Sequence, residues 1–173
     1  MSKIYLVRLD LELFDADFSN IIYGAYLDYK KASDRAEKEF IEYCEMLKDR
    51  DDFKMSHTDP DNYSVSSEAI YAELYIEEVD IAENQEEIKE GSTVYISRYD
   101  NFSDSDLPIE IPYLAFTSRE DCLRHIDTYF VKYSELGKDK EALAVHEISE
   151  EDKYVYWKDM FVSFCLEKVE VDD

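Results

Sequence analysis

The chain has 173 residues, 45% of them hydrophobic, which is enough to bury the core of one ordinary domain or of two small ones. Its 43 acidic and 19 basic residues give a formal net charge of -24, which opposes binding to nucleic acid and to anionic membranes and favours a basic partner. Aromatic residues make up 14% of the sequence, so the composition is unlike that of a disordered chain. No apolar run is long enough to cross a bilayer, and the N-terminus lacks a signal-peptide pattern, so we expect a cytoplasmic protein with no membrane contact.

The first residues have the periodicities of two strands followed by a helix. Residues 3–9 alternate in polarity as a strand does, with Ile4 and Leu6 on one face, and a polar loop leads to a second short strand at 21–27. Asp28 is of a type that caps helix N-termini, and the apolar residues after it recur every three or four positions, which predicts an amphipathic helix. The stripe consists of Ala32, Ala36, Phe40, Tyr43 and Leu47.

Strand sequence and then a linker follow this helix. An alternating apolar set predicts a strand with one buried face, and its members are Ile70, Ala72, Leu74 and Ile76. An extra strand is expected near 63–67. Residues 82–91 are polar and acidic and end in glycine, which is typical of a linker.

The sequence beyond the linker repeats the elements before it. An offset of ninety residues places Tyr95 on Tyr5 and Arg98 on Arg8 without a gap. The same offset aligns Ile111, Tyr113, Ala115 and Phe116 with Ile21, Tyr23, Ala25 and Tyr26. We interpret Arg8 and Arg98 as internal salt-bridge partners of acidic neighbours.

The second half is therefore expected to contain the same elements. Strands are predicted at 93–99 and 111–116, and a helix is predicted to begin at Ser118, with Asp121 completing a capping box, and to end at Gly137. Met160, Val162, Phe164 and Leu166 alternate as the closing strand, and an extra strand is expected near 154–157.

These elements predict an α+β fold formed by tandem duplication of a ββαβ-like unit. Each antiparallel sheet would be covered by one helix. The predicted division is a first repeat at 1–83, an acidic linker at 84–91 and a second repeat at 92–173. The sequence leaves open whether the two repeats share one core or form one continuous sheet.

No residue pattern indicates catalysis, a metal site or a cofactor. The three histidines lie outside any His-Glu-x-x-His motif, and the three glycines cannot form a phosphate-binding loop. The three cysteines, Cys44, Cys122 and Cys165, are widely spaced in apolar patterns typical of buried thiols. Two acidic segments, 59–62 and 100–106, lack the complete calcium-loop pattern and are interpreted as turns. We therefore expect no catalytic residues, no metal and no cofactor.

The closing strand of the first half carries the candidate binding surface. If its apolar residues face inward, Tyr71, Glu73, Tyr75 and Glu77 form an alternating row on the other face. Alternate residues of a strand lie about 6.5 to 7 Å apart, a spacing similar to that of phosphates along a nucleic-acid strand. Eleven acidic residues and one lysine lie between positions 59 and 90. The candidate set is completed by Asp59, Asp61 and Glu68.

We therefore expect a non-catalytic inhibitor that imitates nucleic acid and covers the basic nucleic-acid-binding surface of a partner protein. In composition the chain is similar to acidic phage or mobile-element proteins that act against restriction or CRISPR-type defence systems. Two alternatives stay open, an immunity protein that neutralises a basic toxin and a protein that binds a small ligand between its repeats. An inhibitor predicts a salt-sensitive complex, whereas a small ligand predicts weak salt dependence. The identity of the partner and the oligomeric state are not specified by the sequence.

Overall fold

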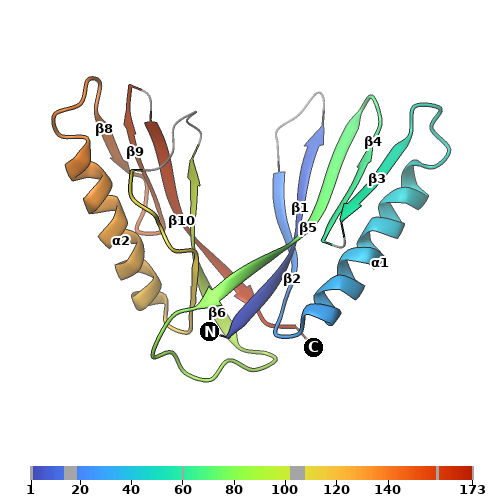
Figure 1. Ribbon diagram of the computed structural model, residues 1–173, viewed down its shortest axis with the longest axis horizontal. Coiled ribbons are helices and arrows are strands. Elements are labelled where there is room, and N and C mark those ends of the chain that lie inside the picture. Colours follow the sequence, from blue (N-terminus) through green and yellow to red (C-terminus); the bar gives the residue numbers. More distant parts are fainter. Residues whose placement is uncertain (1, 14–18, 60, 102–107, 159, 173) are drawn as a thin grey trace. The chain divides into compact units, whose positions relative to one another are not determined.

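The computed structural model describes residues 2–59, 61–101, 108–158 and 160–172, apart from 14–18 (Figure 1). The chain is an α+β protein with a large mixed β-sheet, and its described residues form two helices and ten strands. In chain order the elements are β1 (Lys3–Leu13), β2 (Ser19–Tyr26), α1 (Tyr29–Leu47), β3 (Lys54–Asp59), β4 (Asn62–Ser66), β5 (Ile70–Ile81), β6 (Thr93–Asn101), β7 (Leu114–Phe116), α2 (Arg119–Leu136), β8 (Ala144–Glu147), β9 (Asp152–Trp157) and β10 (Met160–Glu170). Neither helix combines the length and the apolar character that spanning a lipid bilayer requires.

The chain is divided into two compact units, which we call the first unit and the second unit. The first consists of Ser2–Val79, Lys89–Gly91 and Glu170–Asp173, and the second contains Asp80–Ile88 and Ser92–Val169. Each unit thus includes a short segment from the other half of the sequence. The contiguous division into 1–83, 84–91 and 92–173 stays a prediction.

In the first unit, the strands lie in the order β2, β1, β5, β4, β3, and helix α1 covers one face of this sheet (Figure 1). The helix begins where the sequence predicted it, because the Asp28 carboxylate accepts a hydrogen bond from the Lys31 backbone N–H at 3.1 Å. Its apolar stripe packs on inward residues of β4 and β5, among them Val65 and Leu74. The outer edge strand β3 carries few apolar residues.

In the second unit, the strands lie in the order β7, β6, β10, β9, β8, and α2 covers one face. The predicted cap at Ser118 is confirmed, since its hydroxyl accepts from the Asp121 N–H at 3.4 Å. Helix α2 ends at the predicted Gly137, and crowding explains the glycine. A Cβ there would lie 2.5 Å from the Leu143 Cδ1 and 2.9 Å from a ring carbon of Trp157.

Two pairings make the sheet mixed, so the expectation of purely antiparallel strands is wrong at these points. At the end of β5, Asp80 and Ile81 pair in parallel with Leu114 and Ala115 of β7. Beyond β10, Val171 forms a parallel bridge with Ala25 of β2. Strands β5 and β10 extend past their hairpin partners, and the backbone groups of such extensions need new partners.

The order of elements is ββαβββ in both units, which is longer than the predicted ββαβ. The extra strands expected near 63–67 and 154–157 are present as β4 and β9. The strands missed in the sequence are β3 and β8, which are short and lie at sheet edges where polarity does not alternate strongly. Although the two units share one order of elements, the tandem duplication itself stays a prediction.

Candidate partner-binding surface

Strand β5 has the two-sided character that its sequence predicted. Ala72 and Leu74 lie in the core beneath α1, and Ile70 and Ile76 pack against that core. The intervening side chains lie on what we call the helix-free face, the sheet face opposite the helix of the unit. They are all half-buried, and they are Tyr71, Glu73, Tyr75 and Glu77.

Glu73 is held in place by two neutral donors. The Asn62 side-chain amide of β4 donates to its carboxylate at 2.6 Å, and the Tyr71 hydroxyl donates at 3.0 Å. Burial raises the pKa of Tyr71, and the hydrogen bond to Glu73 raises it further. Both donors are neutral, so these two bonds orient the carboxylate without placing a positive charge beside it.

Glu77 has a different role, because it pairs with Arg8 of β1. The Arg8 side chain is 1% exposed, and its second arm donates to the Asn20 amide oxygen at 2.8 Å. Asn20 in turn donates to Asp10 and, at 3.3 Å, to the Tyr75 hydroxyl. Burial raises the pKa of Tyr75, and the charge of Asp10 adds to this. The predicted internal salt bridge of Arg8 is thus confirmed, and in this pair the positive charge of Arg8 balances the negative charge of Glu77.

The other three candidate residues lie apart from the β5 row. Asp59 ends β3 with its backbone paired to Asn62, and its side chain is outside the described part of the structure. Asp61 accepts a hydrogen bond from the Tyr29 hydroxyl at the start of α1. Glu68 is exposed in the turn between β4 and β5, where it lines an open depression of about 420 Å³. Asp61 and Glu68 therefore lie at opposite ends of this hairpin.

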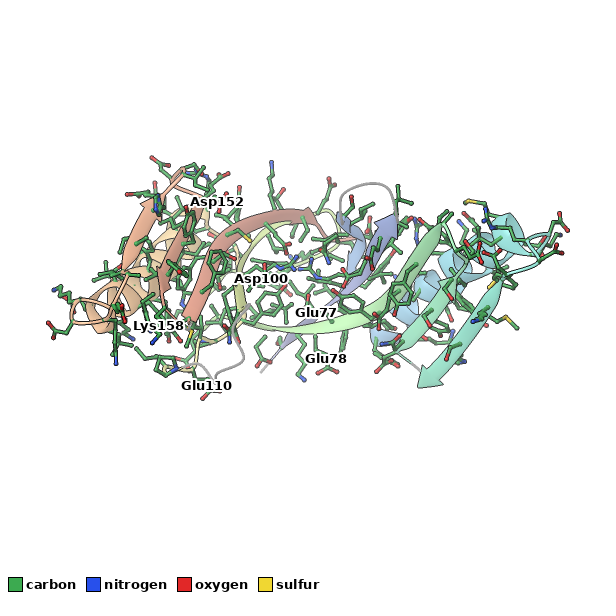
Figure 2. The ribbon with its side chains drawn as sticks, turned by 90° about the horizontal axis from the view of Figure 1, so that it is seen from above. Glu77, Glu78, Asp100, Glu110, Asp152 and Lys158 are labelled. Carbon is green, nitrogen blue, oxygen red and sulfur yellow. The ribbon has the colours of Figure 1, made fainter. Side chains whose placement is uncertain are left out.

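The helix-free face of the second unit contains a related ionic network. Arg98 donates to Asp100 at 3.1 Å and to Glu167 at 3.1 Å, which confirms its predicted role as an internal partner. Burial raises the pKa of the nearby Cys165 thiol to about 12, with further contributions from Glu167 and Asp100 and a smaller one from Asp152. Asp100 and Asp152 are labelled in Figure 2.

Sequence reasoning missed an aromatic row on this second helix-free face. The His146 ring of β8 stacks on Tyr154 of β9 with centroids 4.6 Å apart, and Tyr154 stacks on Phe161 of β10 at 5.5 Å. The neighbouring residues Lys153 and Val155 are buried on the α2 side, which places Tyr154 on the opposite face. The alternation of tyrosines in β9 was the available signal. We call His146, Tyr154 and Phe161 the aromatic row.

Internal ion pairs consume most of the positive charge of the protein. All six arginines pair with carboxylates. Lys153 is buried, and its ammonium group lies 2.6 Å from Asp127 and 2.5 Å from Glu147. Burial alone would lower the pKa of Lys153, but the hydrogen bonds and charges of these two carboxylates outweigh it and raise the pKa. The acidic surplus is therefore left to the surface.

The described residues contain no group of three or more His, Cys, Asp or Glu side chains arranged to hold a metal ion. Comparisons with protein families, with curated proteins and with solved structures found no match to this chain.

Proposed function

We propose that this protein is a non-catalytic inhibitor that binds the basic nucleic-acid-binding surface of a partner protein and excludes nucleic acid by competition. The observation that carries the proposal is the distribution of charge. The net charge is -24 and all six arginines are already paired with carboxylates, so the surface offered to a partner is strongly negative. Such a field speeds association with a basic surface and makes the complex sensitive to salt.

The β5 row supplies oriented acceptors for this purpose. Glu73 is fixed by Asn62 and Tyr71, so its carboxylate loses little conformational freedom when a cationic group binds. Tyr71 and Tyr75 offer flat, partly apolar contact area beside it. Glu77 supports the surface indirectly, because its charge balances the buried Arg8.

Tandem duplication is part of the proposal, and the ionic networks support it. Arg98 lies ninety positions after Arg8, and its partner Glu167 lies ninety positions after Glu77. Two copies of one scaffold give the chain two acidic helix-free faces. The composition supports an origin in a phage or mobile element, cytoplasmic action and a target in a restriction or CRISPR-type defence system.

The test is capture of partners from bacteria that carry defence systems, with elution by a salt gradient and by added DNA or RNA. Two variants of equal charge change are compared. The first is Glu68→Lys with Glu73→Lys, at the candidate surface, and the control is Glu42→Lys with Glu45→Lys, on the exposed side of α1. Glu77 is left unchanged, because lysine there would face the buried Arg8.

We expect the wild type and the control to retain a basic nucleic-acid-binding protein that competing nucleic acid displaces, and the surface variant to lose it. Equal loss in both variants would contradict the surface assignment and indicate attraction by total charge. A partner displaced by salt but not by DNA or RNA would contradict mimicry and favour the immunity-protein alternative.

A further inference from the structure

We infer that the aromatic row of the second unit binds arginine side chains, so that the partner presents an arginine-rich segment. This inference rests on the proposed function and specifies the chemistry of its partner. The row crosses three neighbouring strands, because His146 is the cross-strand partner of Tyr154 and the Phe161 ring stacks on Tyr154 diagonally. The Tyr156 ring, 39% exposed, extends it as the cross-strand partner of Phe161.

The fold does not require aromatic residues at these places. In the first unit, the positions that correspond to His146 and Tyr154 are Ser56 and Ser64, and these two serines are cross-strand partners in the same way. That sheet forms the same strand order with hydroxyls where the second unit has stacked rings. The rings at 146 and 154 are therefore a specific property of the second helix-free face, and a binding role explains their presence there.

The charge beside the row selects a cationic occupant. Asp152 lies on the same face of β9 as Tyr154, and among the described residues it forms no ion pair or side-chain hydrogen bond. A nucleic-acid base would also stack on such rings, but its phosphates would meet a chain of net charge -24. A cation that stacks on a ring and also pairs with a carboxylate satisfies both features of the site.

Arginine fits this combination better than lysine. The guanidinium group is planar, stacks on aromatic faces and donates two parallel hydrogen bonds to a carboxylate, whereas the ammonium of lysine is compact and strongly hydrated. Nucleic-acid-binding surfaces use arginine for the same geometric reason when they recognise phosphate. The aromatic row together with Asp152 therefore distinguishes an arginine-rich surface from one that is merely positive.

The experiment measures binding of two fluorescent peptides, nona-arginine and nona-lysine, to the full chain by anisotropy at about 150 mM salt, where long-range attraction is screened. The main variant, His146→Ser with Tyr154→Ser, installs the residues of the first unit. The wild type should bind nona-arginine about tenfold more tightly than nona-lysine, and the variant should bind the two peptides nearly equally. Tyr154→Phe keeps the ring and should retain the preference.

Two controls show whether a lost preference for arginine comes from the aromatic row itself. One tests whether each variant is folded, and the other tests the candidate surface of the first unit. Circular dichroism must show a cooperative melt for each variant. The Glu68→Lys and Glu73→Lys variant should keep the ratio of the two affinities. Equal wild-type affinities for the two peptides, no binding of either, or an unchanged ratio in the serine variant would overturn the inference. If the serine variant still captures the nucleic-acid-binding partner and nucleic acid still displaces it, the arginine site fails while the proposed function stands.

Discussion

The buried guanidinium of Arg8 provides a quantitative test of how the helix-free faces are stabilised. Its side chain is 1% exposed and pairs with Glu77, whereas Arg98 is 22% exposed and pairs with both Asp100 and Glu167. Breaking a buried ion pair by removing one partner costs about 3 to 5 kcal/mol. Since Glu77 is itself 32% exposed, we expect Glu77→Gln to cost about 3 kcal/mol. Glu167→Gln leaves Asp100 beside Arg98, so it should cost about 1 kcal/mol.

The two variants change the net charge equally, so each is the control for the other. Urea unfolding at pH 7, followed by circular dichroism, measures the difference. With a denaturant slope of about 2 kcal/mol per M, the midpoint should fall by about 1.5 M for Glu77→Gln and by about 0.5 M for Glu167→Gln. Equal shifts, or a larger shift for Glu167→Gln, would refute the reasoning that burial of Arg8 sets the cost.

Three further predictions concern packing and titration. Gly137→Ala should lower the free energy of unfolding by about 2 kcal/mol, because the added methyl group overlaps packed side chains. Gly91→Ala has open space around it but a φ of 77°, so backbone strain should lower the free energy of unfolding by about 1 kcal/mol. Equal losses for the two variants in calorimetric melting would contradict this. Because the pKa of Lys153 is raised in the folded protein, its stabilising contribution is present below pH 10.5 and is lost as the pH rises further. Lys153→Met should therefore make the free energy of unfolding, measured in urea, less dependent on pH above pH 10.5. Burial raises the pKa of Cys165 from 9.0 to about 12, so the free energy of unfolding should fall as the pH rises from 9.0 to about 12. Alkylation at pH 8, followed by mass spectrometry, should modify the less buried Cys44 well before Cys165.

Local patterns were sufficient to predict the helices. A capping residue and an apolar stripe depend on neighbours within one turn, which is why the starts at Asp28 and Ser118 and the end at Gly137 could be located from the sequence. The parallel bridge from Val171 to Ala25 could not, because no local pattern specifies which distant backbone completes a strand. Strands β3 and β8 were missed for a related reason. Each is a short edge strand that pairs with one neighbouring strand, so its sequence carries little apolar alternation.

The candidate surface shows the same limit. Alternation in β5 was enough to place Glu73 on the helix-free face, but its donor Asn62 lies on another strand, and only the strand register brings the two together. The aromatic row was missed because His146, Tyr154 and Phe161 come from three strands and none is unusual by itself. Sequence alternation thus predicts which face a side chain occupies, whereas its neighbours on that face depend on pairing.

The parallel bridge at Ala25 also has a consequence for biosynthesis. The first unit includes residues 170 to 172. Val171 forms the bridge to Ala25, the backbone N–H and the carboxylate of Asp172 hydrogen-bond to the Ala25 backbone, and the Gly91 N–H donates to the Val171 carbonyl at 2.7 Å. A ribosome adds these residues only after every residue of the second unit up to Val169 has been translated. Because domains fold as their residues become available, strands β1 to β5 and helix α1 can fold early, but they lack these last strand partners while the second unit is translated. The first unit is therefore completed only after the second has been translated, and β2 keeps an unpaired edge at Ala25 until then.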